Sequence, residues 1–191
     1  MAKVTLQHKT VVYPMPAFLI GANVDDKPNF MTAAWSGIAG GEPPVITVGI
    51  RHSRYTLKGV KQNMTFSVNV PSTDIARETD YCGIESGSKV DKVKVCGFNV
   101  FYGKLETAPM VEQCPVNLEC KVMHMLDVGS HMLVVGEITE TYITEGCLLE
   151  GKPDVDKIKP FAFNPRPGGD YQAFGKLVGK AFDIGLELRK I

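Results

Sequence analysis

The stretch NFMTAAWSGIAGGEPPVITVGIRHSRYT, from Asn29 to Thr56, holds three unusual segments in succession. Its first part, NFMTAAWSG, is a strand-like run of small and hydroxyl residues around Trp35, the only tryptophan of the chain. Its middle, EPPVITVGI, is a short β-branched run typical of a buried strand. Its end, RHSRYT, places two arginines beside hydroxyl residues where a helix is expected to begin. The stretch therefore predicts a strand, a turn at Gly40-Gly41, a second strand and a helix start.

The two ends of this stretch together predict a ligand site. Four side chains can donate hydrogen bonds to one anion: Arg51, Ser53, Arg54 and Thr56. The backbone N–H groups of a first helical turn point the same way. The small residues beside Trp35 leave room for a flat ring. Each end also has a plainer interpretation, with solvated arginines beside a helix cap and Trp35 in the core, but together they favour a flat aromatic ligand with a phosphate tail.

At these residues the sequence resembles the flavin reductase-like, FMN-binding split-barrel family, and within it the flavoredoxins. The motifs are N-x-M-T-A-A-W-S at Asn29–Ser36 and R-x-S-R-Y-T at Arg51–Thr56. The D-K pair at Asp91-Lys92 and S-H-x-L-x-x-G-E at Ser130–Glu137 extend the resemblance over nearly the whole chain. It implies a mainly β fold with flanking helices, a split β-barrel, and FMN as the cofactor.

The resemblance also implies which residues bind FMN. Around the ring and ribityl chain it implies Asn29, Met31, Thr32, Ala33, Ala34 and Trp35. Around the phosphate it implies Arg51, Ser53, Arg54 and Thr56. Lys92 would approach the flavin or its phosphate, and His131 would lie against the flavin, where it can donate a hydrogen bond or supply positive charge. Phe163 and Asn164 would close the other side of the ring. Without the resemblance, Lys92 would be a solvated charge and His131 a half-buried turn residue.

Length and composition set the class of protein. The 191 residues fit one domain spanning 1–191, large enough to bury a core without disulfides. Lys+Arg and Asp+Glu both number 21, and this neutrality argues against a general nucleic-acid binder. We see no secretory signal and no apolar run near the ~20 residues needed to span a bilayer. Five cysteines without a pairing pattern fit reduced thiols in the cytoplasm.

The remaining pattern is mostly that of short strands. Residues 11–24 and the stretch after Asp25-Asp26 predict a hairpin. Ser53 is expected to cap a helix running to Asn63, and shorter helices are expected up to Gly83 and Gly97. The sharp period of two from Val116, with Asn117, Glu119 and Lys121 on the opposite face, predicts a long strand hairpinned to HMLVVGEITE. FAFNPRPGGD reads as a loop. The following YQAFGKLVGKAFDIG reads as an amphipathic helix, capped by Asp170 and ended by Gly185.

A metal site is not expected. Cys114, Cys120 and His124 are tempting ligands, but the last two lie four residues apart on a strand, roughly 13 Å at about 3.3 Å per residue. The chain has no C-x-x-C pair, no H-E-x-x-H helix, no phosphate loop and no G-x-G-x-x-G fingerprint. A nicotinamide donor would therefore have to stack directly on the flavin.

Three functions remain open from the sequence. The first is a flavoredoxin-like flavoprotein that transfers electrons through bound FMN, whose residues position and tune the cofactor without acting as acids or nucleophiles. The second is an NAD(P)H:flavin oxidoreductase that releases reduced flavin or reduces ferric complexes. The third is a flavin-free binding domain of the same shape. The resemblance implies a homodimer, and a redox partner protein or NAD(P)H as partner. No nucleic-acid or membrane partner is expected.

Overall fold

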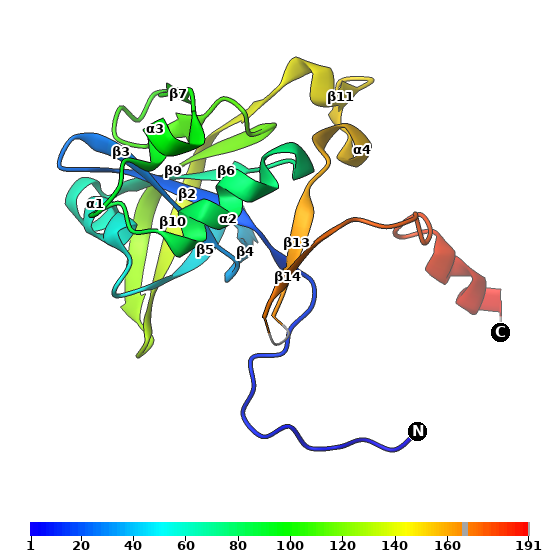
Figure 1. The fold of residues 1–191 in the computed structure, drawn as a ribbon. Coiled ribbons are helices and arrows are strands. Elements are labelled where there is room, and N and C mark those ends of the chain that lie inside the picture. Colours follow the sequence, from blue (N-terminus) through cyan, green and yellow to red (C-terminus); the bar gives the residue numbers. More distant parts are fainter. Residues whose placement is uncertain (166–167, 191) are drawn as a thin grey trace.

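β-strands dominate the computed structural model, which describes residues 1–165 and 168–190 (Figure 1). Seven antiparallel strands form the main sheet, in the spatial order β3 (Lys27–Ala33), β2 (Phe18–Val24), β6 (Thr65–Val70), β9 (Val116–Asp127), β10 (His131–Ile143), β5 (Pro44–Arg51) and β4 (Ser36–Gly41). The predicted hairpin of β2 and β3 is confirmed, with its turn at Asp25-Asp26. β4 replaces the predicted turn at Gly40-Gly41, since the chain reverses after Gly41 instead.

One apolar core lies inside the curved sheet. Six of the strands contribute side chains to it, together with helix α1 (Tyr55–Asn63). The main buried members are Ile20, Ala22, Met31, Ile46, Val48, Ile50, Leu57, Val60, Phe66, Val68, Val122 and Val134. Because strands from both halves of the sheet meet at this core, the predicted mainly β barrel with flanking helices is confirmed.

Helix α1 packs directly on β2. Leu57 and Val60, three residues apart, are both buried, as the sequence predicts. Gly59 lies so close to β2 that a Cβ there would overlap the Asn23 carbonyl. The predicted Ser53 cap is wrong, because the N-cap residue is Arg54, which makes no side-chain capping hydrogen bond. The first turn of α1 therefore keeps its N–H groups free of a side-chain cap.

Two helices cover the outer side of β3. They are α2 (Ala76–Ile84) and α3 (Lys92–Cys96), and α3 ends at Gly97 with φ of 63°, as expected for a left-handed C-terminal residue. A second apolar cluster holds them to the sheet and includes Leu19, Phe30, Cys82, Phe98, Val111 and Cys114. Both helices were predicted, and this cluster explains why they stay against the barrel.

The predicted hairpin of β9 and β10 is confirmed, but one face of β9 is more buried than its pattern indicates. Glu119 is fully buried, and its carboxylate accepts hydrogen bonds from the backbone N–H groups of Lys104 and Leu105 and from the Tyr142 hydroxyl. These residues belong to the loop between β7 (Val100–Phe101) and β8 (Met110–Val111) and to β10. A buried carboxylate here has partners supplied by a distant loop, which local periodicity cannot reveal.

A small sheet flanks the barrel, built from β1 (Met15–Pro16), β13 (Phe161–Asn164) and β14 (Asp170–Ala173). The segment read as a loop is therefore partly a strand, because Phe161–Asn164 pairs with Met15–Pro16 and with Asp170–Ala173. Arg166 and Pro167 of that segment lie outside the described residues. The lesser elements before this sheet are β11 (Leu148–Leu149), β12 (Lys152–Pro153) and α4 (Val155–Ile158).

The predicted amphipathic helix in the tail is wrong. Asp170–Ala173 is strand β14 rather than a capped helix start, and only a 3-10 helix, Ile184–Lys190, follows. Gly175 and Gly179 lie in the predicted helix, and each glycine costs about 1 kcal/mol relative to alanine in a helix interior. The tail also has no surface beneath it, whereas helices in proteins owe most of their stability to packing. Among the described helices, none is both long and apolar enough to cross a membrane.

Candidate functional site

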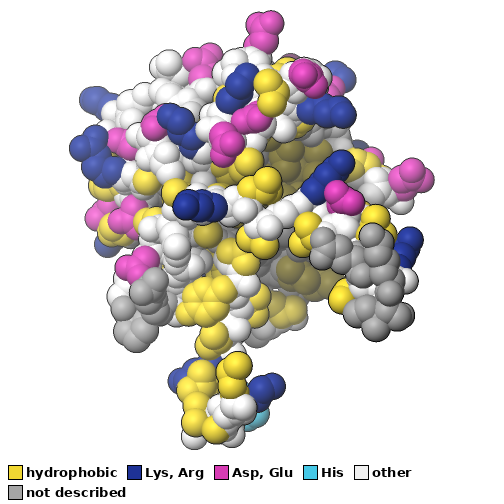
Figure 2. Space-filling model, turned by 90° about the vertical axis from the view of Figure 1, so that its right-hand side faces the viewer, with side chains coloured by type: hydrophobic (Ala, Val, Ile, Leu, Met, Phe, Trp, Pro, Cys, Tyr) yellow, Lys and Arg dark blue, Asp and Glu magenta, His cyan; other side chains and the backbone are white. Residues whose placement is uncertain are grey.

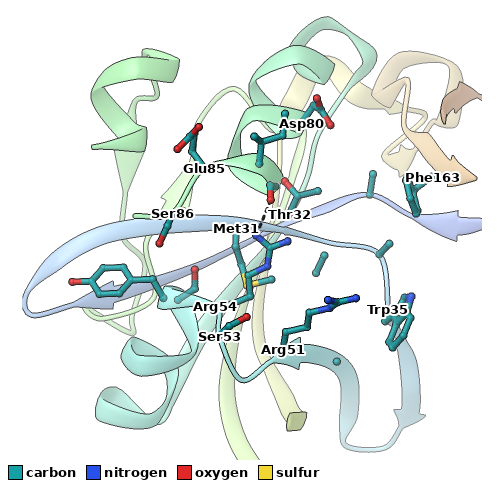
Figure 3. A pocket seen from close by; sticks show the side chains of 18 of the residues that line it. Met31, Thr32, Trp35, Arg51, Ser53, Arg54, Asp80, Glu85, Ser86 and Phe163 are labelled. Atoms are coloured by element: carbon teal, nitrogen blue, oxygen red, sulfur yellow. Dashed lines mark hydrogen bonds between the residues drawn. The ribbon is translucent and has the colours of Figure 1, made fainter. Parts of the chain in front are cut away.

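A cavity of about 690 Å³ lies between the start of α1, the junction of β3 and β4, and the C-terminal end of α2 (Figure 3). Twelve of the fourteen residues predicted from the sequence line it: Met31, Thr32, Ala33, Ala34, Trp35, Arg51, Ser53, Arg54, Thr56, Lys92, His131 and Phe163. These residues come from five separate stretches of the chain: 31–35, 51–56, Lys92, His131 and Phe163. The fold therefore gathers the motifs of the sequence at one place.

The middle of the cavity is cationic. Arg51 and Arg54 reach into it (Figure 3), and Lys92 of α3 also lines the cavity. Among the described residues, none of these three cations forms a salt bridge, although Asp80 and Glu85 also line the cavity. Burial lowers the pKa of Arg54, and the charge of Arg51 lowers it further. The positive charge gathered here is therefore not neutralised by protein carboxylates.

Lys92 is held by backbone carbonyls instead of a carboxylate. It is only 4 % exposed, and its Nζ donates to the carbonyl oxygens of Phe30 and Cys82, each at 2.8 Å. Burial lowers the pKa of Lys92, and so does the nearby Arg54. Two of the three ammonium donors are thus used, and an anion in the cavity would compensate the buried charge.

Residues of the cavity anchor the C-terminal half of α2. The carbonyl of Thr79 accepts a hydrogen bond from Thr32 Oγ1. In the last turn, the carbonyls of Cys82 and Gly83 accept from Lys92 Nζ and Arg54 Nη1, the latter at 2.7 Å. Carbonyls of the last helical turn have no partners within the helix, and cations are stabilising there. The same cations therefore shape the cavity wall and charge its interior.

Beside Arg51 the cavity has a flat aromatic wall. The chain leaves β3 at Ala33 and begins β4 at Ser36, and Trp35 lies at this break with its carbonyl accepting a hydrogen bond from Gly49 N at 2.7 Å. The Trp35 ring stacks on the His131 ring, with centroids 4.5 Å apart and planes 28° from parallel. The indole is 42 % exposed, so it is not a core residue.

His131 is buried at the start of β10. Its Nδ1 lies 2.7 Å from Ser130 Oγ, and it is the register partner of Arg51 on β5. Burial lowers the pKa of His131, and the charges of Arg51 and His52 lower it further. These effects favour the neutral form of the His131 ring.

A third wall comes from the small sheet. Phe163 of β13 lines the cavity beside Tyr171 of β14, whose hydroxyl donates to Asp80 Oδ1 of α2 at 2.9 Å. The two rings lie 5.9 Å apart. Burial and this carboxylate raise the pKa of Tyr171. The hydrogen bond ties the flanking sheet to α2 and so closes the cavity between them.

Two predicted residues do not line the cavity. Asn29 is buried behind it, and its Nδ2 donates to Thr56 Oγ1 at 2.7 Å. Asn164 donates instead to Gln172 Oε1 at 2.9 Å across the small sheet. Asn29 can therefore act on a ligand only by orienting Thr56, and Asn164 by holding the hairpin that carries Phe163.

Sequence reasoning missed most of the cavity wall opposite the arginines. The missed residues include Thr10, Ala17, Gly49, Tyr55, Asp80, Gly83, Ile84, Glu85, Ser86, Gly87, Pro165 and Tyr171. The segment after α2 carries no motif that marks a site. Its one signal is Ser86-Gly87-Ser88, and a Cβ at Gly87 would overlap Asn29 Oδ1, which shows how closely this loop approaches the barrel.

The cysteines take no part in the cavity. All five are free thiols, and burial raises the pKa of Cys82, Cys114 and Cys120. In the part of the chain that the structure describes, no three His, Cys, Asp or Glu side chains are grouped to hold a metal ion.

The chain is similar in sequence and structure to known proteins. The model of the flavin reductase like domain family matches residues 10–159. The crystal structure of flavoredoxin from Methanosarcina acetivorans is 40 % identical, with a TM-score of 0.94, covering 98 % of this chain and all of that one. Flavoredoxin of Desulfovibrio vulgaris (Miyazaki F) is 36 % identical, with a TM-score of 0.89. The match covers 96 % of this chain and 100 % of that one.

A more distant structure shares the fold. The FMN-binding protein from Thermus thermophilus is 24 % identical, with a TM-score of 0.77, covering 94 % of this chain and 97 % of that one. The family model and the structural matches each cover most of the chain. The chain belongs to the flavin reductase like domain family, with the split-barrel fold of its FMN-binding members.

Proposed function

We propose that the protein binds FMN in this cavity and transfers electrons through it, as a flavoredoxin-like carrier. The observation that carries the proposal is one cavity lined by three cations, which form no salt bridge among the described residues, and by a stacked aromatic wall. Its volume of about 690 Å³ lies within the range of small-molecule sites. FMN has a dianionic phosphate at one end and a flat ring at the other, so its chemistry fits both.

The cationic and hydroxyl residues around the start of α1 would hold the phosphate. Arg51 and Ser53 lie before α1, and the hydroxyl of Thr56 lies in its first turn. The first N–H groups of a helix have no partner within it and bind anions well. Arg54 and Lys92 are already fixed by carbonyls of α2, so their charges are positioned before any ligand arrives.

The residues around Trp35 would position the flavin ring. Small side chains at Ala33 and Ala34 leave the backbone accessible, while Trp35 and His131 form a flat boundary. Neutral His131 can donate a hydrogen bond without adding charge. FMN, when bound, accepts a hydride or exchanges single electrons, and the chain supplies its orientation and electrostatic surroundings.

A second function, as an NAD(P)H:flavin oxidoreductase, is favoured by the wall of Asp80, Ile84 and Tyr171. These residues give the cavity a further wall, on which a second flat molecule could lie against the flavin. In the first function the electrons instead come from a redox partner protein. The family match is compatible with both functions, because its description is that of flavin reductases.

An absorbance spectrum of the purified protein tests the proposal. We expect yellow protein that releases FMN, identified by mass, at close to one per chain. Anaerobic NADH or NADPH should leave the spectrum unchanged if a protein partner supplies the electrons, and should bleach it rapidly if the protein is a reductase. Colourless protein that takes up no added FMN would instead identify a flavin-free binding domain.

A further inference from the structure

The C-terminal segment 174–190 leaves the barrel and carries exposed apolar side chains. Figure 1 shows it extending clear of the sheets, and its backbone hydrogen bonds in the described residues run within the segment. Its exposed large side chains are Phe174, Leu177, Val178, Phe182, Ile184, Leu186 and Leu188. Val178 is 94 % exposed and Phe182 is 99 % exposed. Apolar patches of this extent on a folded chain mark an interaction surface.

The same chain carries an apolar hollow on its barrel. It has a volume of about 300 Å³ and lies beside Trp35, with Val12, Pro14, Met15 and Pro16 from the N-terminal arm forming its other side. Trp35 lines both this hollow and the larger cavity. Figure 2 shows hydrophobic side chains gathered around a hollow on the face from which the termini project.

Charge permits the tail of one copy to lie on the barrel of another. Residues 1–13 contain Lys3 and Lys9 and no carboxylate, and residues 174–191 contain four basic and two acidic residues. The two termini thus hold a net charge of +4, and because the whole chain is neutral, the remaining residues hold −4. Two neutral copies do not repel each other as whole molecules, and the residues that line the hollow carry no charge that would oppose the basic tail.

The exposed area is sufficient for a stable pair. Seven large apolar side chains at roughly 100 Å² each offer on the order of 700 Å² per tail, about the share that one partner gives to a standard interface. Two tails exchanged about a two-fold axis, with the surfaces beneath them, would exceed the ~1,600 Å² of such an interface. The exchange also gives a closed dimer, because each copy has one tail and one hollow and both are used in the pair.

We infer that segment 174–190 of one copy packs into the hollow beside Trp35 of a second copy, so that each flavin cavity is completed by its partner's tail. The tail thereby contacts Trp35, which also lines the cavity. The inference does not depend on flavin binding.

Photocrosslinking tests the docking site. The full-length protein, as purified, is prepared with p-benzoylphenylalanine in place of Phe182 and irradiated. We expect an adduct of twice the chain mass whose crosslinked peptides contain residues 10–16 or 34–36. An adduct of single-chain mass would show that the tail folds onto its own barrel, and a dimer adduct at other residues would show that it docks elsewhere. Either result, or no adduct in a protein that sediments as a dimer, overturns the inference.

The single tryptophan gives an independent measurement. Phe182→Asp and Val178→Asp should at least double the acrylamide quenching constant of Trp35 fluorescence and reduce the dimer fraction in sedimentation. Val155→Asp, at a 54 % exposed position of α4, is the control and should change neither. Unchanged quenching in both tail variants contradicts the inference. The flavin content of each variant, read from its visible absorbance, shows separately whether the proposed cofactor is bound.

Discussion

At the scale of single residues, the cavity is defined by charges without carboxylate partners. Arg51 is exposed and makes no salt bridge among the described residues, whereas Arg54 and Lys92 are held by carbonyls at the end of α2. Arg51 is therefore free to serve a ligand, and the other two also serve the fold. A substitution of Arg51 tests anion binding most cleanly.

We expect Arg51→Gln to weaken FMN binding by about tenfold to a hundredfold, the usual effect of losing one charged hydrogen bond. Riboflavin lacks the phosphate, so its binding should change by less than about twofold. Calorimetric or fluorescence titration with both ligands measures the two constants. Lys58→Gln is the control. Lys58 lies on α1 and pairs with Asp25 of the turn between β2 and β3, and neither residue lines the cavity. Equal losses for both ligands would mean that Arg51 does not contact the phosphate.

His131 makes stability depend on pH. Its pKa is lowered in the folded protein by burial and by Arg51 and His52, so the unfolded chain binds this proton more readily. The contribution to stability is therefore complete above the ordinary histidine pKa of about 6.5, and is lost as the pH falls below it toward the lowered value. Urea unfolding at about pH 7.5 and pH 5.5 should show a smaller difference for His131→Gln than for wild type. His8→Gln, in the exposed arm, should behave as wild type, and an identical pH slope in all three proteins would refute this assignment.

The residues of the site were predictable where motifs carry them. The motifs at Asn29–Ser36 and Arg51–Thr56 named much of the cavity lining before the fold was known. The wall from Asp80 to Gly87 was not predictable, because these residues reach the cavity only through the packing of α2 on β3. The resemblance implies that Asn29 binds the ligand, yet Asn29 does not line the cavity and reaches it only through its hydrogen bond to Thr56.

At the scale of elements, strong local patterns predicted the structure and weak ones did not. The hairpin of β9 and β10 and the helix α1 follow from uninterrupted periods of two and of three to four residues. Strand β4 was read as a turn because half of its six residues are glycines, and its ladder with β5 is what defines it. The tail shows the reverse error, since its amphipathic pattern has no surface to pack on in the single chain.

Helix α1 offers a prediction whose sign is unusual. Gly→Ala in a helix normally stabilises by about 1 kcal/mol. Gly59→Ala should instead destabilise by about 1–3 kcal/mol, because the new methyl group overlaps the Asn23 carbonyl and the close packing of α1 on β2 must yield. Chemical denaturation measures the difference. Gly146→Ala has open space around its Cβ and should stay within about 0.5 kcal/mol of wild type. A stabilised Gly59→Ala protein would show that α1 is not seated this closely.

At the scale of the whole molecule, the barrel brings segments that are distant in the sequence together around one cavity. The start of α1, the end of α2, the β3 to β4 junction and the small sheet each contribute one wall. The cavity wall combines cations with stacked rings, which suits a ligand that carries both an anionic group and a flat ring. Neither feature alone distinguishes FMN from a simple phosphate or a simple aromatic compound.

The most direct test of this account compares the dissociation constants of FMN and riboflavin for the wild-type protein at about 50 mM and 200 mM salt. The account predicts that FMN binds at least about a hundredfold more tightly, as expected for two or more charged hydrogen bonds to the phosphate. It also predicts that added salt narrows this ratio by weakening FMN binding more than riboflavin binding. Equal affinities for the two ligands at both salt concentrations would contradict it.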